Sequence, residues 1–573
     1  MAQARAETMV HDVVIIGSGA GGGTVTKVLT DLGVSVVLME AGPMIGMEDF
    51  KMLKAPYDVP HRGAGEHAEA YVGDGSGAGL GFGASYGGFG IEGEPYTVAP
   101  GSQFGWFRSR VIGGRTNHYG RHQLRFADYD FAPRARDGLG VDWPISYDEI
   151  APYYDKAERL IGVTGKAEGI RSLPDGIFQP PAPLKVHEEL VQRSAAKLGI
   201  RAINARHAII TTPTNGRPAC HYCGQCTRGC ATASNYASSY IQIFPAMQSG
   251  RVKVVPNAMA RELITDASGK VSAVSYVDKE TGTERQVRCR TVVLAASACE
   301  SARLLLNSTA SGHPDGVANS SGVVGRNLMD SVGYGMTAHI PAMVGMPSYN
   351  GDGYGAGHLL IPWWLWDRKD LDFPRGYHVE VYGGYYMPGI GSFQGSVNDA
   401  EGYGLPMKQA IREGYGNYVN LAGRGEMIPN ENSYCEIDPT GVVDKWGIPV
   451  LRFHWQWGDY ELNQVRHMQK TFSEIFDGMG GVYEPPASAE GEAKVPISVG
   501  GSVVHELGTV RMGDDPRTSV LNNFCQAHEV PNLFVADAAP FAGNPDKNPT
   551  HTIIALAWRT AEYLAEEMRK RNV

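Results

Sequence analysis

The N-terminal segment combines two apolar runs with a helix-like segment between them. Residues 13–16 are apolar and mostly β-branched, residues 24–32 have a helical composition, and residues 34–39 are again mainly apolar. Glu40 follows the second run directly. Three glycines stand between the first run and the helix in the order Gly-x-Gly-x-x-Gly: Gly17, Gly19 and Gly22. This order predicts strand, tight turn, helix, strand and acidic residue, as in dinucleotide-binding folds.

Each glycine of this pattern has a physical purpose. Gly17 permits the tight turn, Gly19 lets the backbone approach a pyrophosphate at the helix N-terminus, and Gly22 lets the helix pack close to the strand. Glu40 would accept hydrogen bonds from ribose hydroxyls. The alternative is a glycine turn that only serves packing. The pattern predicts a bound dinucleotide and does not decide between NAD and FAD.

The remaining chain alternates between helical and strand-like periodicity, and its second half changes character. Residues 331–495 are rich in aromatic residues, Gly and Pro, and alternation at 434–437 and 450–455 predicts an antiparallel sheet. The other predicted elements are helices at 186–198, 299–306 and 555–568, strands at 252–258 and 291–298, and a hairpin around 266–270. The chain is therefore predicted to be an α/β protein.

Composition limits the class of protein and its partners. With 573 residues the chain is too long for one core, so at least two packed domains are expected. A hydrophobic fraction of 43% and a mean hydropathy of −0.23 indicate a soluble globular protein. The net charge of −10 argues against nucleic acid as a partner. No apolar run reaches the roughly 18 residues of a membrane span, and residues 1–12 lack the apolar segment of a secretory signal.

Four of the eight cysteines lie together with the spacing C-x2-C-x2-C-x3-C: Cys220, Cys223, Cys226 and Cys230. This spacing is that of bacterial ferredoxins, although Ala231 replaces the usual proline. An iron–sulfur cluster is the favoured interpretation. A structural zinc site, or disulfides and idle thiols, remain alternatives.

Several further motifs identify a family. Gly113-Gly114-x-Thr-x-His118 follows the N-terminal motif, and His505-x-x-Gly-Thr-x-x-Met-Gly precedes a segment that contains Asn548. In this order they resemble the glucose–methanol–choline (GMC) oxidoreductases. The resemblance implies FAD as the dinucleotide, and a Rossmann-like FAD-binding domain with a mainly antiparallel-sheet substrate domain (the GMC fold).

The resemblance also implies a set of FAD contacts. His118 matches the position that carries a covalent flavin bond in pyranose oxidases, whereas in related sugar dehydrogenases the same histidine is unlinked. The predicted cofactor-binding residues are Gly17, Gly19, Gly22, Glu40, Ala41, Arg110, Gly113, Gly114, Asn117, His118, Ala258, Asp537, Ala538, Asn548 and Thr550.

His505 and Asn548 are the predicted catalytic pair. In the family the histidine faces the flavin, and its partner is a second histidine or an asparagine. A neutral imidazole suits the removal of an alcohol proton during hydride transfer to flavin N5, and an amide can hold the hydroxyl without titrating. Possible substrate contacts are Glu426, Asn430, Asn432 and His551.

The predicted organisation is discontinuous. Residues 1–48, 100–165, 245–335 and 500–573 form the FAD-binding domain, 49–99 a Gly-rich lid, 205–240 the cysteine-cluster loop, and 336–499 the substrate-binding domain.

The predicted function is that of an FAD-dependent dehydrogenase that oxidises a sugar or glycoside hydroxyl and passes electrons through the cluster to an external acceptor. Among the iron–sulfur members of the family, the chain is most similar in style to glucoside 3-dehydrogenases. This resemblance implies a 3Fe-4S cluster, with 4Fe-4S as the alternative. It also implies a small partner subunit and a cytochrome as electron acceptor. The alternatives are an oxidase that reduces O2 with structural cysteines, or a non-catalytic electron-transfer subunit. Export to the periplasm on the partner's signal is expected, with the cytoplasm as the alternative.

Overall fold

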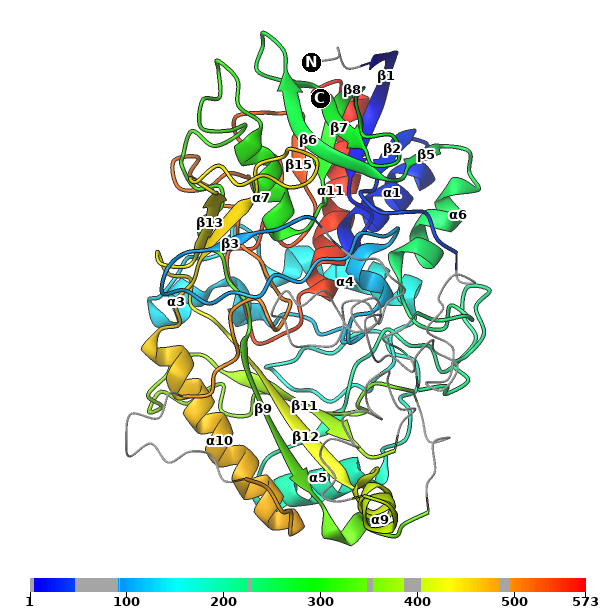
Figure 1. Cartoon of the computed structure of the whole chain (residues 1–573), viewed down its shortest axis with the longest axis vertical. Coiled ribbons are helices and arrows are strands. Elements are labelled where there is room, and N and C mark those ends of the chain that lie inside the picture. Colours follow the sequence, from blue (N-terminus) through cyan, green and yellow to red (C-terminus); the bar gives the residue numbers. More distant parts are fainter. Residues whose placement is uncertain are drawn as a thin grey trace.

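The computed structural model describes residues 5–46, 91, 93–224, 226, 229–347, 354–385, 403–484 and 495–573. Most of the predicted Gly-rich lid at 49–99 lies outside the described residues, so its conformation stays a prediction. Figure 1 shows a large sheet with its helices in one half of the molecule and a second sheet in the other, with both termini in the first half.

A seven-stranded sheet forms the first half. Its order is β5-β2-β1-β8-β7-β6, with β15 also pairing with β8. β5, β2, β1, β8 and β15 are parallel, whereas β7 is antiparallel to β8 and β6 is antiparallel to β7. The strands are β1 (Arg5–Ile16), β2 (Val36–Met39), β5 (Val252–Val255), β6 (Ala258–Thr265), β7 (Val271–Asp278), β8 (Thr283–Leu294) and β15 (Leu533–Val535).

Helices cover both faces of this sheet, which explains why its central strands are apolar without interruption. Val13 and Ile15 pack with α1 (Ala20–Asp31) and α11 (Thr550–Lys570). Val14 and Ile16 point the other way, into the core that includes α7 (Ala298–Asn307). The predicted N-terminal strand–turn–helix–strand order is therefore confirmed.

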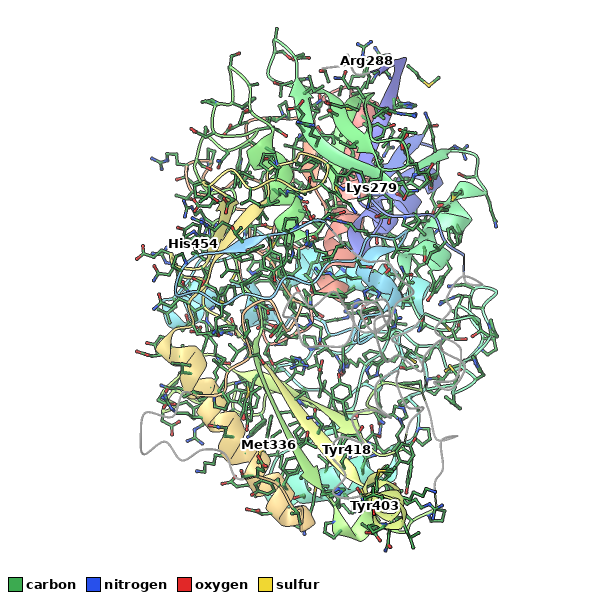
Figure 2. The ribbon with its side chains drawn as sticks, viewed as in Figure 1. Lys279, Arg288, Met336, Tyr403, Tyr418 and His454 are labelled. Atoms are coloured by element: carbon green, nitrogen blue, oxygen red, sulfur yellow. The ribbon has the colours of Figure 1, made fainter. Side chains whose placement is uncertain are left out.

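A five-stranded antiparallel sheet forms the second half, in the order β4-β10-β11-β12-β9. Helix α10 (Asp459–Met479) packs on it through an apolar stripe, and α5 (Val186–Lys197) lies beside α10 (Figure 1). Met336 and Tyr418, labelled in Figure 2, lie on the neighbouring strands β9 and β12. The strands are β4 (Ile203–Asn204), β9 (Val332–His339), β10 (Leu359–Ile361), β11 (Tyr377–Gly383) and β12 (Tyr418–Gly425).

A third, small sheet has the order β13-β14-β3. β13 (Tyr434–Ile437) and β14 (Leu451–His454) form the predicted antiparallel pair. Their partner is β3 (Thr97–Val98), and β13 lies against α7, so they do not extend the five-stranded sheet.

Shorter helices connect the three sheets. They are η7 (Gly114–Asn117), η8 (Asp128–Phe131), α3 (Pro133–Asp137), α4 (Tyr147–Ile161), η9 (Ser239–Ile243), α6 (Phe244–Met247), η10 (Pro341–Met343) and α9 (Leu405–Gly414). Among the described residues, no helix is both long and apolar enough to cross a membrane.

Candidate active site

A cavity of about 480 Å³ lies at the carboxyl ends of the parallel strands. Gly17, Glu40, Ala295 and Asp537, which line it, follow β1, β2, β8 and β15 in the chain. Open α/β sheets place ligands at this edge, because loops that follow parallel strands meet there. The same cavity reaches the five-stranded sheet through Tyr382 and Arg424. It therefore joins the two halves of the molecule.

Two positions of the glycine motif have no room for a side chain, and the third faces open space. Gly17 has φ +99°, and a Cβ there would lie 2.3 Å from the carbonyl oxygen of Ala295. A Cβ on Gly22 would lie 1.9 Å from the Gly17 oxygen. A Cβ on Gly19 would meet no atom within 4 Å, although this residue lines the cavity. The space beside Gly19, at the N-terminus of α1, fits the pyrophosphate of a dinucleotide.

Glu40 is buried at the end of β2 and tied to the glycine turn. Its carboxylate accepts a hydrogen bond of 2.5 Å from Ser18 Oγ and one of 2.8 Å from the Gly42 amide. Burial raises its pKa, while these hydrogen bonds and the charge of Arg110 oppose the rise. The carboxylate is thus fixed beside the position that a ribose would take.

Most of the predicted cofactor-binding residues lie on the cavity wall. Those lining it are Gly17, Gly19, Glu40, Ala41, Arg110, Gly114, His118, Ala258, Asp537, Ala538, Asn548 and Thr550. Gly22, Gly113 and Asn117 do not line it, and their contact with a cofactor stays a prediction. Asn117 Nδ2 instead donates to the Ile112 oxygen at 2.9 Å, which shapes the loop that presents His118.

His118 is buried in this wall beside Phe107, with the two rings edge to face. Burial, aided by the charges of Arg121 and Arg115, lowers its pKa to about 3. The imidazole is therefore neutral at ordinary pH. A covalent bond between His118 and a flavin stays a prediction.

The structure brings the predicted catalytic pair together. His505 Nε2 lies 3.4 Å from Asn548 Nδ2, and both residues line the cavity. On its other side, His505 Nδ1 lies 2.9 Å from Ser331 Oγ. An amide nitrogen can only donate, so Nε2 carries the lone pair and Nδ1 carries the proton. Asn548 stands two residues before α11, next to the N-cap residue Pro549.

The electrostatics of the cavity keep His505 neutral. Burial, aided by the charge of Arg424, lowers the pKa of its imidazole to about 3. A neutral imidazole can accept a proton at Nε2, its unprotonated ring nitrogen, which lies beside Asn548 in this wall.

Sequence reasoning missed a group of polar side chains on strand β11. Because successive residues of a strand face opposite sides, His378, Glu380 and Tyr382 share one face, while Val379 and Val381 point into the core. Glu380 Oε1 accepts a hydrogen bond of 3.0 Å from Asn548 Nδ2. Alternating polar residues within an apolar strand were the signal that could have revealed them.

Glu380 is the centre of a buried network. Its Oε2 accepts a hydrogen bond of 2.9 Å from Tyr382 and lies 3.3 Å from Arg424 Nε, and its Oε1 lies 3.2 Å from His122 Nε2. Burial alone would raise the pKa of Glu380, but the charges of His122 and Arg424 hold it well below its usual range. Since burial lowers the pKa of His122 to about 4, Arg424 is the partner that is charged at neutral pH.

Tyr382, Arg424 and His122 line the cavity around the catalytic pair, with Glu380 directly behind them. The other lining residues that sequence reasoning missed include Ser18, Arg115 and Arg121. Ser18 lies inside the glycine motif, and His122, Arg115 and Arg121 lie inside the block at 108–125.

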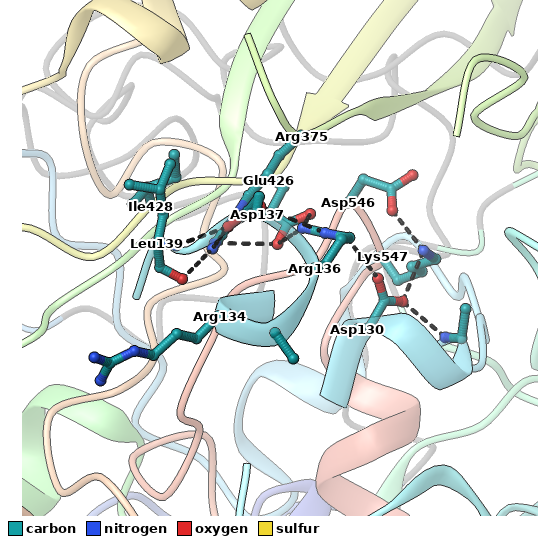
Figure 3. A network of polar contacts seen from close by, with 12 residues as sticks. Asp130, Arg134, Arg136, Asp137, Leu139, Arg375, Glu426, Ile428, Asp546 and Lys547 are labelled. Atoms are coloured by element: carbon teal, nitrogen blue, oxygen red, sulfur yellow. Dashed lines mark hydrogen bonds and ion pairs between the residues drawn. The ribbon is translucent and has the colours of Figure 1, made fainter. Parts of the chain in front are cut away.

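The four predicted substrate contacts do not line the cavity. Glu426 is paired with Arg136 at 3.0 Å and with Arg375 at 3.2 Å, in the buried network of Figure 3. His551 Nε2 lies 3.1 Å from Glu158, and its ring stacks on Tyr154. Asn430 and Asn432 lie on a partly exposed turn, where Asn430 Nδ2 donates to the Gln456 oxygen. These residues lie outside the cavity wall, and their contact with a substrate stays a prediction.

The cysteine motif forms a loop beside the same cavity, which Cys226 lines. The amide of Gly355 donates to Cys226 Sγ at 3.4 Å, and that of Tyr222 to Cys220 Sγ at 3.3 Å. Burial, with neighbouring cysteines adding to it, raises the pKa of Cys220 to about 12 and that of Cys226 to about 11.

In the described part of the chain, no group of three or more His, Cys, Asp or Glu side chains is arranged to hold a metal ion. The iron–sulfur cluster therefore stays a prediction.

Two family models described as GMC oxidoreductase match residues 15–332 and 429–557. The chain is 29% identical to 2-methyl-1,2-propanediol dehydrogenase of Mycolicibacterium austroafricanum, over 97% of this chain and 95% of the relative. It is 27% identical to the fructose dehydrogenase large subunit of Gluconobacter japonicus, over 98% and 99% of the two chains.

A solved structure of Aspergillus oryzae formate oxidase has a similar fold. It superposes with a TM-score of 0.65 at 15% identity and covers 100% of both chains. The predicted fold class is thereby confirmed.

Proposed function

Because a GMC oxidoreductase model matches more than half of its length, the chain belongs to that family, and we propose that it is an FAD-dependent oxidoreductase that oxidises a CH–OH group of a sugar or polyol. The observation that carries this proposal is the position of His505 and Asn548 on the same cavity as Gly17 and Gly19. The glycine turn would hold the pyrophosphate, and the pair would face the substrate hydroxyl. The names of two relatives, a diol dehydrogenase and a fructose dehydrogenase, support the substrate class.

Residues of the protein remove the proton from the substrate hydroxyl. FAD, when bound, supplies the acceptor for the hydride of the C–H bond. The Nε2 lone pair of His505 takes the O–H proton, and Ser331 keeps the ring oriented through Nδ1. A positioned general base of this kind contributes about 10²- to 10⁴-fold to a rate.

Anaerobic flavin reduction tests the proposal. We expect the visible flavin absorbance of the purified holoenzyme to bleach when sugars or polyols are added without oxygen. Simple aldehydes and carboxylates of the same size serve as controls and should leave the absorbance unchanged. If no alcohol in a broad panel bleaches the flavin, the proposal is wrong.

The finer proposal concerns the electron acceptor and rests on the cysteine spacing. We propose that electrons leave the flavin to an external acceptor such as a cytochrome, and that the enzyme works with a small partner subunit. The substrate is oxidised on the sugar ring, as in glucoside 3-dehydrogenases. Iron and sulfide in the purified protein, dye reduction with little peroxide, and a 3-keto product from a glucoside would support it. Iron-free protein with rapid peroxide formation would favour the oxidase instead.

A further inference from the structure

The turn that presents His505 contains a strained residue. Val504, which stands directly before His505 and lines the cavity, has a φ of 62°. Its amide donates to the Gly501 oxygen at 3.1 Å, which closes the turn. A β-branched residue at positive φ is an outlier, and such a conformation persists only where neighbouring groups impose it. Groups around the turn must therefore hold Val504 in place.

Asp330 holds the chain on both sides of Val504. Its Oδ1 accepts a hydrogen bond of 2.9 Å from the His505 amide, and its Oδ2 accepts one of 3.2 Å from the Val503 amide. Asp330 is fully buried and stands two residues before β9. One carboxylate thus fixes the backbone before and after the strained residue.

The same carboxylate also holds the residue that orients the imidazole. Asp330 Oδ1 accepts a second hydrogen bond of 2.9 Å from the amide of Ser331, whose Oγ lies 2.9 Å from His505 Nδ1. Beside it, Met329 and Leu507 exchange two backbone hydrogen bonds of 3.0 Å. The backbone of His505 and its ring are therefore both positioned from the segment around Asp330.

A carboxylate at this position is kept against the cost of its burial. Burial and the charge of Glu506 raise the pKa of Asp330 to about 7, although three backbone amides oppose the rise. Arg115 Nη1 lies 2.7 Å from Glu506 Oε2 and donates to the Val504 oxygen at 3.3 Å. A carboxylate accepts on both oxygens, whereas an asparagine amide accepts on one only. Two acceptors are what the amides on either side of Val504 require.

We propose that Asp330 is a positioning residue of the oxidation: by accepting the two amides that flank Val504, it holds the strained turn that fixes the place of His505 in the cavity wall. This inference rests on the proposed function and deepens it. Without the carboxylate, Val504 relaxes to negative φ, and the His505 backbone rotates with it. A displacement of about 1 Å at a reacting group lowers a rate by about 10²-fold, so the loss belongs to the reaction and not to substrate binding.

Asp330→Asn tests this role without changing the size of the side chain. One of the two amides loses its acceptor, because the asparagine presents only one oxygen. We expect the rate constant of anaerobic flavin reduction at saturating polyol to fall about ten- to a hundredfold. The dissociation constant of the polyol should stay within about threefold of its wild-type value, and the FAD content should be unchanged.

Asp438→Asn is the matched control. Asp438 is also buried and accepts a hydrogen bond of 2.7 Å from the Thr440 amide, but it lies outside the cavity wall that the structure describes. Its variant should reduce the flavin at the wild-type rate. An unchanged rate in Asp330→Asn with full FAD content would overturn the inference and leave the proposed function intact.

Val504→Gly provides a rescue that a general structural role of Asp330 would not give. Glycine adopts positive φ without strain, so the turn no longer needs to be held. In the Val504→Gly background, Asp330→Asn should lower the rate by less than about threefold, and its effect on the thermal midpoint should also be smaller than in the wild-type background. Losses of the same size in both backgrounds, or a failure of both Asp330 variants to fold, would overturn the inference.

The wild-type holoenzyme separates this inference from the proposed function. If no sugar or polyol reduces its flavin, the proposed function is wrong. The four thermal midpoints of the wild type, the two single variants and the double variant then still test whether Asp330 holds the turn, because they do not depend on a substrate. Additive changes in the midpoint would overturn that role.

Discussion

Two glycines of the N-terminal turn differ in the space around them, and this difference distinguishes a packing role from a role in cofactor binding. Gly22 has no room for a side chain, because a Cβ would lie 1.9 Å from a backbone oxygen. Gly19 has an ordinary φ of −65° and free space around it. The first position is thus required by strand–helix packing, whereas the second leaves space for a ligand.

This difference makes Gly19 and Gly22 a matched pair for mutation. Gly22→Ala should lower the thermal stability of the cofactor-free protein. Gly19→Ala should leave that stability unchanged and reduce the FAD content of the purified protein, because its methyl group occupies the space of the pyrophosphate. Thermal unfolding and the ratio of flavin to protein measure both effects. Full FAD content in Gly19→Ala would contradict the placement of the cofactor.

The segment that precedes α11 is the element that presents Asn548, and buried charges hold it. Lys547 Nζ lies 2.8 Å from Asp130 and 2.6 Å from Asp546, as Figure 3 shows. The Asp546 carbonyl oxygen accepts a hydrogen bond from His378 of β11. Burial, with the charges of Asp546 and Glu426 adding to it, raises the pKa of Asp130 to about 6 although Lys547 opposes the rise. The catalytic amide thus depends on an ion cluster outside the cavity.

Removing the charge of Lys547 should lower the stability of the folded protein. Lys547→Met leaves two buried carboxylates without their cation, and we expect the free energy of unfolding to fall by about 3–5 kcal/mol. Flavin reduction should slow as well, because Asn548 follows directly in the chain. Lys570→Met, at an exposed lysine at the end of α11, is the control and should change little. Similar losses of stability in both variants, by chemical denaturation, would contradict the role of the cluster.

Across the whole molecule, the features that could be predicted from the sequence are those that depend on residues close together in the chain. The glycine turn, Glu40 and the strands around them follow from periodicity, and His505 and Asn548 stand in recognisable motifs. Alternation along β11 could have indicated that Glu380 and Tyr382 share one face, but their meeting with Arg424 could not be predicted, because it depends on the pairing of β11 with β12. The ion pair of Glu426 could not be predicted either, because its partner Arg136 lies 290 residues away in the sequence. Long-range ion pairs of this kind leave no local pattern.

The two halves of the molecule together form the site. The seven-stranded sheet supplies the cofactor side of the cavity, the five-stranded sheet supplies Tyr382 and Arg424, and the C-terminal region contributes His505 and Asn548 between them. The central claim is that His505 accepts the proton of an alcohol oxidised in this cavity.

The rate of anaerobic flavin reduction by a polyol, compared between the wild-type holoenzyme and His505→Ala, tests this claim most directly. We predict that the variant keeps its FAD and its thermal stability while the rate falls by about 10²- to 10⁴-fold. An unchanged rate in a variant with full FAD content would contradict the claim.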